Sequence, residues 1–262
     1  MSFRRVVGIF LIVVGIVSLV HADEILNALK GSCRITASTQ ENRFELRLER
    51  GSCADGRQCN ESTISEPADA FTGLSLADLK RDGSHVDAVL REEAGTLTCS
   101  GNIRDSSVIG EFTFEPNHGF VVRMGQLGIT GFDSEKLQTY TLFRINSNWV
   151  QSLQKQGIQG INSNNLIAMK IFKVDPAYVE SMTALGYPTP SAEKLIAMRV
   201  HKVDPDEVKQ FRAMGYEPTL DQLVEMRIFK VTPEFIDRMK ARGLNNLTIS
   251  KLVQIRIFKL DE

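Results

Sequence analysis

The sequence predicts an α+β protein, in which an N-terminal antiparallel β sheet or sandwich is followed by an α-solenoid of about five 29-residue helix-pair repeats. Two observations support this prediction. Before residue 116, apolar and β-branched residues alternate with polar ones in short runs, which is the period of a half-buried strand. In the second half, glycine, leucine and phenylalanine recur every 28 or 29 residues, and a fixed period of this length is typical of stacked supersecondary units.

Residues 1–22 predict a secretory signal peptide. Arg4 and Arg5 precede an apolar run from Val6 to Val20, and the small residue Ala22 follows, which is the layout of a cleaved export signal. The run of about 15 residues is shorter than the roughly 20 that a membrane-spanning helix needs. We therefore expect cleavage after Ala22 rather than retention as an anchor. The mature chain should then have no membrane span and a periplasmic or extracellular location.

All four cysteines fall within residues 23–116, the predicted β domain. An even number of cysteines in an exported chain predicts two disulfides. The turn-rich spacing between Cys53 and Cys59 suits a local bond, which leaves Cys33 to pair with Cys99. The alternative is a zinc site, but these cysteines lack the close pairing and nearby histidines that such sites use. We therefore expect no metal site.

Within the β domain, five alternating runs predict strands that bury one face and expose the other, as in an antiparallel sheet. Residues 71–79 predict a short helix or turn packed on that sheet. The polar stretch 51–66 predicts a long surface loop closed by the Cys53–Cys59 bond. The predicted strands are residues 34–39, 44–50, 86–90, 95–100 and 108–114.

The helical repeat domain is predicted over residues 117–262, where three columns of residues share one period. Each unit should be a pair of short helices that is too small to be stable alone and that gains its core by stacking on its neighbours. The columns are Gly128, Gly157, Gly186, Gly215 and Gly243; Leu137, Leu166, Leu195, Leu223 and Leu252; and Phe143, Phe172, His201, Phe229 and Phe258. His201 is expected to pack as a substitute for phenylalanine.

The unit that begins at Asp175 shows why these residues form a helix pair. Asp175 and Pro176 are an N-cap and a first helical residue, and Gly186 can take the left-handed conformation that ends a helix. After a turn, Ser191 begins a second helix that runs to Val200. Thr232 and Pro233 repeat the start signal.

Two columns of cations accompany the second helix of each unit and are the candidate binding residues. One explanation is that cations near a helix C-terminus interact favourably with its carbonyl groups, by about 0.3–1 kcal/mol each. The other is a basic ridge that binds an acidic protein segment, an anionic lipid or a phosphate-bearing glycan. The columns are Lys170, Arg199, Arg227 and Arg256, and then Arg144, Lys173, Lys202, Lys230 and Lys259.

Overall charge and motifs exclude several classes of function. Residues 23–145 hold 13 basic against 19 acidic residues, and residues 146–262 hold 16 against 13. Net charges of -6 and +3 are far from the strongly basic balance of a nucleic-acid binder. The sequence has no His-Glu-x-x-His pair, phosphate-binding glycine loop or Gly-x-Ser-x-Gly elbow. A non-catalytic protein without a cofactor is therefore expected.

The repeat units resemble a known bacterial type. Residues 174–187 read VDPAYVESMTALGY and residues 231–244 read VTPEFIDRMKARGL, and segments such as LIAMRVH and LVEMRIF follow them. They are similar to the repeat regions appended to membrane zinc metallopeptidases of the β-lactam-sensor and antirepressor type, and to related exported proteins. Residues 71–97 and 110–116 resemble the β segment that precedes those repeats. The peptidase motif and its membrane helices are missing, so no catalytic residue carries over.

These features together predict an extracytoplasmic protein-interaction or sensing module that binds a protein or an anionic envelope component through its helical repeats. The alternative is an envelope enzyme or enzyme inhibitor that acts through the disulfide-closed loop 51–66. Nucleic acid is not an expected partner.

Overall fold

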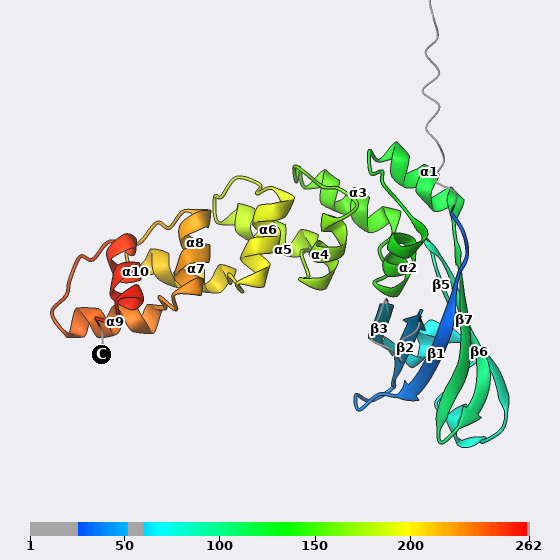
Figure 1. The fold of residues 1–262 in the computed structure, drawn as a ribbon. Coiled ribbons are helices and arrows are strands. Elements are labelled where there is room, and N and C mark those ends of the chain that lie inside the picture. Colours follow the sequence, from blue (N-terminus) through cyan, green and yellow to red (C-terminus); the bar gives the residue numbers. More distant parts are fainter. Residues whose placement is uncertain (1–25, 52–59, 261–262) are drawn as a thin grey trace, which may run out of the picture.

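The computed structural model of the protein describes residues 26–51 and 60–260. The predicted signal peptide, residues 1–22, lies outside the described residues, and so do Cys53, Cys59 and half of the predicted loop, residues 52–59. The protein is of the α+β class, with one curled antiparallel sheet of seven strands followed by ten α-helices in the described part of the chain (Figure 1).

The sheet contains all five predicted strands and two that the alternation did not predict. Its order is β3-β2-β1-β7-β6-β5-β4, and every neighbouring pair is antiparallel. It is a single sheet rather than a sandwich. The strands are β1 (Leu29–Ala37), β2 (Arg43–Arg50), β3 (Asn60–Pro67), β4 (Phe71–Thr72), β5 (His85–Glu92), β6 (Gly95–Arg104) and β7 (Ser107–Pro116).

Strand β3 corrects the prediction of a loop over residues 51–66. Its residues 60–67 pair with β2 in continuous register. Ile64 is its only large apolar side chain and is half-buried. The strand therefore lacks the alternation of apolar and polar residues by which strands are predicted from sequence. Residues 71–79, predicted as a short helix or turn, instead begin with strand β4 and contain one turn of 3₁₀ helix that starts at Asp78.

The predicted disulfide between Cys33 and Cys99 is confirmed, and it shows how strongly the sheet curls. Cys33 is in β1 and Cys99 is in β6, with β7 between them. Strands two positions apart in a flat sheet are separated by about 9.5 Å, whereas the two Cα atoms are 6.0 Å apart. Gly110 of β7 is the register partner of Cys33. A Cβ atom there would lie 2.0 Å from the Ser100 carbonyl oxygen of β6, so only glycine permits this approach.

The ten helices of the described residues are short. Each is 7 or 9 residues long, too short to be stable alone in water. The helices are α1 (His118–Gln126), α2 (Ser134–Leu142), α3 (Ser147–Lys155), α4 (Asn165–Ile171), α5 (Pro176–Ala184), α6 (Ala192–Val200), α7 (Pro205–Ala213), α8 (Leu220–Ile228), α9 (Pro233–Ala241) and α10 (Ile249–Ile257).

The helix starts follow the predicted capping chemistry. The Asp175 carboxylate accepts a hydrogen bond from the Tyr178 N–H at 2.8 Å, and Pro176 is the first helical residue of α5. Thr219 forms a capping box with Gln222 at the start of α8. These side chains satisfy amide groups that have no partner within the helix.

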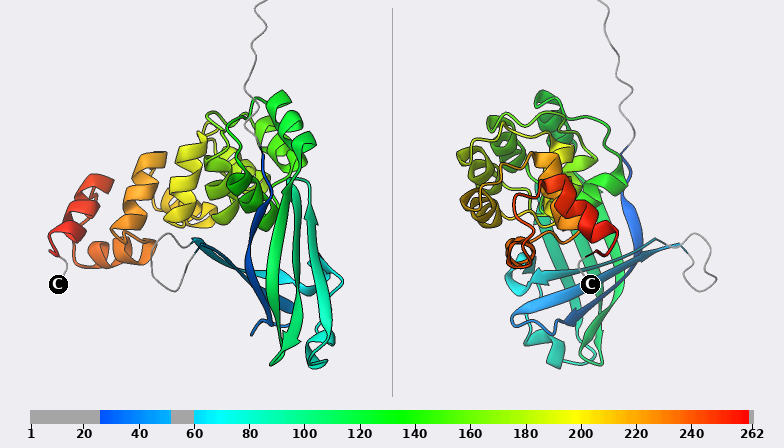
Figure 2. Two further views of the ribbon diagram at one scale, coloured as in Figure 1. Left: turned by 45° about the vertical axis from the view of Figure 1, so that its right-hand side comes forward. Right: turned by 90° about the vertical axis from the view of Figure 1, so that its left-hand side faces the viewer.

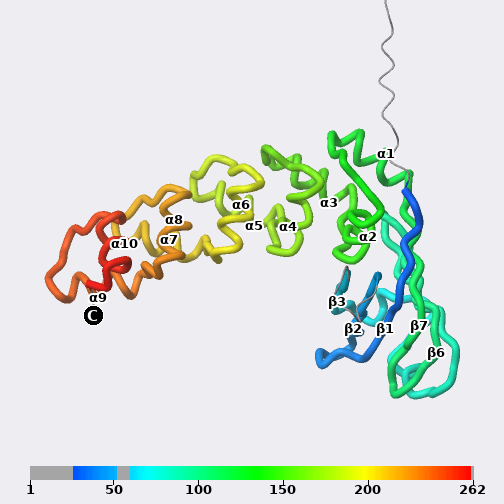
Figure 3. Tube along the Cα trace, in the orientation of Figure 1, coloured from blue at the N-terminus to red at the C-terminus, as the bar shows by residue number. Residues whose placement is uncertain are grey.

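The helix pairs form an arm that leads away from the sheet, with the last pair at its far end (Figures 1 and 3). Helix α2 contacts β5, β6 and β7, so the first pair is docked on the sheet. Further along, α4 contacts α6, α6 contacts α8, and α8 contacts α10. The side chains of the leucine column are 0–2% exposed in all five pairs. The helices leave from one end of the curled sheet (Figure 2).

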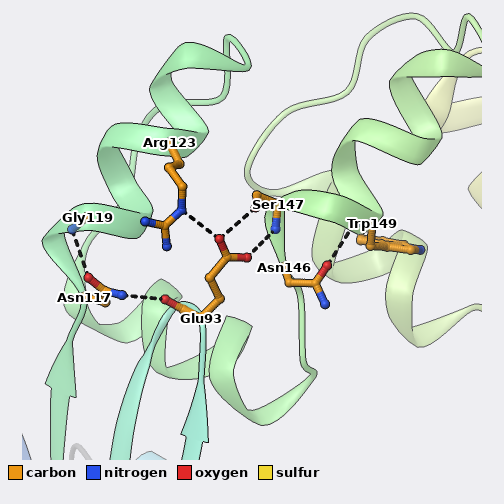
Figure 4. A network of polar contacts seen from close by, with 7 residues as sticks. All are labelled: Glu93, Asn117, Gly119, Arg123, Asn146, Ser147 and Trp149. Carbon is orange, nitrogen blue, oxygen red and sulfur yellow. Dashed lines mark hydrogen bonds and ion pairs between the residues drawn. The ribbon is translucent and has the colours of Figure 1, made fainter.

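A polar network fixes the first two helix pairs to the sheet (Figure 4). Glu93, in the turn between β5 and β6, accepts hydrogen bonds from the Ser147 N–H and hydroxyl, each at 2.7 Å. It also accepts one from Arg123 Nε of α1 at 2.8 Å. Burial raises the pKa of the Glu93 carboxyl, but the bonds from Ser147 and Arg123 outweigh it and leave that pKa below its ordinary value.

Candidate partner-binding surface

All ten helices of the described residues end in the same way but use two different residue types to do so. The residue that follows the C-cap always has a positive φ, between 50° and 89°. Glycine occupies it after the odd-numbered helices, and lysine or arginine occupies it after the even-numbered helices. The residues are Gly128, Gly157, Gly186, Gly215 and Gly243, and Arg144, Lys173, Lys202, Lys230 and Lys259.

The hydrogen bonds at these ends are those of the Schellman motif. After α4, the Lys173 N–H donates to the Lys170 carbonyl at 3.2 Å, and the Val174 N–H donates to the Met169 carbonyl at 2.8 Å. The same two bonds recur after α6 and α8. The predicted lysine column is therefore not on the second helix itself. It lies just beyond the helix, in a conformation that favours glycine by about 1 kcal/mol or more.

The four lysines of this column are exposed, and none of their ammonium groups has an ion pair or hydrogen bond within the described residues. Lys209, another exposed lysine of the arm, by contrast pairs with Asp206 at 2.7 Å. Arg144, which the sequence places in the same column, is different, because it pairs with Glu66 and Glu92 of the sheet. We call the set Lys173, Lys202, Lys230 and Lys259 the lysine ridge.

The arginines of the other predicted column connect successive units. Arg199 Nε donates to the Phe172 carbonyl oxygen at 2.9 Å, and Arg227 Nε donates to the His201 carbonyl oxygen at 3.2 Å. Arg256 Nη2 donates to the Lys230 carbonyl oxygen at 3.0 Å. Each acceptor lies at the C-terminal end of the preceding even-numbered helix, where carbonyl groups lack partners within the helix.

Additional contacts hold this column in place. The Arg199 guanidinium lies 4.7 Å from the Tyr178 ring centroid, and Lys170 Nζ lies 4.9 Å from that of Trp149. Arg227 donates to both Glu207 carboxylate oxygens, at 3.0 and 2.9 Å. Burial raises the pKa of Glu207, and the nearby Arg227 opposes that rise. The two predicted columns thus have different roles: the arginine column supports the arm, and the lysine ridge is available for contact.

Apolar side chains accompany the lysine ridge. In each of the last four units, the residue two positions before the ridge lysine is a β-branched side chain that is 42–48% exposed. These residues are Ile171, Val200, Ile228 and Ile257. The phenylalanine column, which the sequence predicts to be packed, lies at the C-cap positions and is at best half-buried, with Phe258 67% exposed. A row of exposed apolar groups beside cations is typical of an interaction surface.

A groove of about 460 Å³ lies between the ends of α6, α8 and α10. Lys202 and Lys230 of the lysine ridge line it, together with Arg227 and Arg256. Val200 and Met226 add apolar surface. His201, expected to pack as a substitute for phenylalanine, lies on its wall and is half-buried. Of the four cations around this groove, Arg227 is paired with Glu207, and the positive charge of the other three favours an anionic ligand.

The described residues contain neither a candidate metal site nor a helix that could span a membrane. They contain no group of three or more His, Cys, Asp or Glu side chains placed to hold a metal ion. Within residues 26–51 and 60–260, no helix has both the length and the apolar character to cross a bilayer. The alternative site, loop 51–66, divides into strand β3 and residues 52–59, which the structure does not describe.

Two features of the cation columns are not evident from the spacing of the cations alone. The first is the left-handed backbone of the ridge lysines, which an alignment of each ridge lysine with the glycine that ends the first helix of the unit would have predicted. The second is the set of contacts of the arginine column, which could not have been predicted because they join residues 26 or 27 positions apart.

Comparisons with protein-family models, curated proteins and solved structures find no match to this chain.

Proposed function

We propose that the protein is a non-catalytic interaction module that acts outside the cytoplasm and binds an anionic envelope partner along its lysine ridge. The observation that carries the proposal is that four exposed lysines occupy left-handed positions without partners among the described residues. Glycine would fit the backbone better at each of them. The C-terminal carbonyl groups of the helices do not account for the lysines, since the first helices have such carbonyl groups too and end in glycine.

We further propose that the five helix pairs form an α-solenoid. Its support is that side-chain bonds between consecutive units recur at equivalent positions: Gln154 Nε2 donates to the Leu127 carbonyl at 2.8 Å, and Arg212 Nη1 donates to the Leu185 carbonyl. The arginine column adds bonds of the same kind. In solenoids, stacking supplies the core that each pair lacks, and it aligns equivalent residues into an extended surface.

The extracytoplasmic location is supported by the Cys33–Cys99 disulfide, because such bonds persist in oxidising compartments. The resemblance of residues 174–187 and 231–244 to repeats of bacterial envelope proteins supports the same location. The proposal therefore places the curled sheet and the arm together in the cell envelope, with the lysine ridge facing the partner.

Partner capture with a charge-reversed variant tests this function. One variant carries Glu at Lys173, Lys202, Lys230 and Lys259. A control carries Glu at four exposed lysines away from the ridge, Lys30, Lys80, Lys155 and Lys251. Both variants change the net charge equally. After crosslinking in the native cell, we expect the wild type and the control to recover the same component and the ridge variant to lose it.

The proposal would be wrong if both variants, shown by circular dichroism to be folded, recovered the component as well as the wild type does. It would also be wrong if the control lost the component to the same extent as the ridge variant. Overall charge, rather than the lysine ridge, would then govern binding.

A further inference from the structure

Resting on the proposed function, we infer that the lysine ridge binds an acidic segment of a partner protein in the polyproline II conformation, with a carboxylate at every third residue. The segment would run across the ends of the even-numbered helices. Its carboxylates would pair with successive ridge lysines, and its intervening residues would contact Val200 and Ile228.

The spacing of the ridge supports this conformation. Helices α4, α6, α8 and α10 contact one another in sequence, and the axes of packed helices lie about 8–10 Å apart. Because each ridge lysine occupies the same position after its helix, the lysines should repeat at about that interval. A polyproline II chain has three residues per turn and rises about 3.1 Å per residue, so every third side chain lies on one face at intervals of about 9.3 Å.

Other regular conformations fit the interval less well. A β-strand places side chains on one face at intervals of about 6.7 Å or 13 Å, and both are outside the expected range. An α-helix returns to the same face after seven residues, or about 10.5 Å, which is above the expected interval of about 8–10 Å. An acidic segment also favours an extended state before binding, since like charges repel.

A protein segment is favoured over a lipid surface by the shape of the site. Lys202 and Lys230 border a recessed groove rather than a protruding edge. The β-branched residues beside the ridge are less than half exposed, so little of their surface could enter the acyl region of a bilayer. A narrow chain can reach both the lysines and the apolar residues from within the groove.

Fluorescence anisotropy with labelled peptides tests this inference on the mature full chain. One peptide has Glu at positions 1, 4, 7 and 10 with Ala and Pro between them, and a second has the same composition with Glu at positions 1, 3, 5 and 7. We expect the first peptide to bind about fivefold more tightly, because the second misaligns about two pairs worth roughly 0.5 kcal/mol each. The ridge variant should lose this preference, and arginine at all four ridge positions should retain it.

Three results would overturn the inference. Equal binding of the two peptides would show that the ridge selects charge and not spacing. Tighter binding of a helical peptide with Glu at every seventh residue would replace the extended ligand by a helix. Binding to anionic phosphatidylglycerol vesicles that depends on the ridge lysines, without peptide binding, would identify a lipid surface. None of these results contradicts the proposed function, which fails if crosslinking shows no dependence specific to the ridge.

Discussion

At the residue scale, the protein uses one backbone conformation for two purposes. Gly186 and Lys202 both follow a helix and have φ values of 82° and 55°, yet one lacks a side chain and the other presents an ammonium group. Glycine adopts this conformation readily, whereas a residue with a Cβ atom is sterically strained in it. The strain at Lys202 indicates that its side chain serves a purpose other than helix termination.

Replacing Lys202 by glycine should therefore separate stability from binding. We expect the Lys202→Gly variant to gain about 0.5 kcal/mol, since relief of the left-handed strain exceeds the added entropy of the unfolded chain, and to bind its partner more weakly. Gly186→Ala should lose about 1 kcal/mol. Both values can be measured by urea denaturation. Lys202→Ala serves as the control, because it removes the charge and keeps the strain, and a gain in that variant would contradict the explanation.

Glu93 gives a second prediction at this scale. Its pKa is lowered in the folded protein, so the stability it contributes is present above its unfolded pKa of about 4.5 and is lost as pH falls through the folded value. Near pH 7, Glu93→Gln should destabilise the protein by about 2 kcal/mol, because it weakens bonds to a charged acceptor. This difference should shrink below pH 4.5. Thermal unfolding of both proteins between pH 3 and 7 measures it, with the exposed Glu115→Gln as a matched variant. A difference independent of pH would exclude this role for the Glu93 charge.

At the scale of elements, the arginine column explains how short helices can be stacked. Each arginine satisfies a carbonyl group at the end of the preceding even-numbered helix. The ridge lysines, three residues further along, make no such bond within the described residues. In each unit, the arginine thus contributes to the assembly of the arm, and the ridge lysine stays exposed.

Arg227 and Lys230 test this division because both lie at the end of α8. Arg227→Met should lose about 3 kcal/mol, since it removes a bond to the His201 carbonyl and leaves Glu207, whose side chain is 14% exposed, without its partner. Lys230→Met should change stability by no more than about 0.5 kcal/mol. Adding Glu207→Gln to Arg227→Met should restore part of the loss. Equal effects of the two methionine substitutions, measured by urea denaturation, would contradict the division.

At the scale of the whole molecule, the sheet and the arm share one continuous hydrophobic core. Helix α2 packs on β5, β6 and β7, while Glu93 and Arg144 tie the helices to the sheet by ion pairs. The sheet therefore provides a base for α2, and α4, α6, α8 and α10 contact one another in sequence.

This shared core predicts that a substitution that destabilises the sheet will also destabilise the arm. Replacing Cys33 and Cys99 by alanine removes a bond that spans 66 residues, and loop-closure entropy then predicts a loss of about 4 kcal/mol. Trp149, the single tryptophan, lies in α3, so its fluorescence reports on the arm. We expect its unfolding midpoint to shift together with the circular dichroism of the whole protein. A Trp149 transition that did not move would show that the arm unfolds independently of the sheet.

Patterns local in the chain predict most of the secondary structure and little of the candidate site. Alternation identifies five strands, and the capping residues and the leucine column identify the helix pairs, because both depend on neighbours a few positions apart. Strand β3 is not predicted, since its polar residues are held by register with β2 rather than by an apolar face. The pairing of Cys33 with Cys99 follows from the spacing of the other two cysteines, but the curl that brings them together does not.

By itself, the sequence determines that this chain has strands, then repeated helix pairs, with cations at regular places. Only the tertiary structure decides that the arginine column is engaged in contacts between units while the lysine ridge stays exposed. The physical reason is that a cation's role depends on which carbonyl or carboxylate groups lie within hydrogen-bonding distance. Those groups belong to another unit, and stacking brings them close.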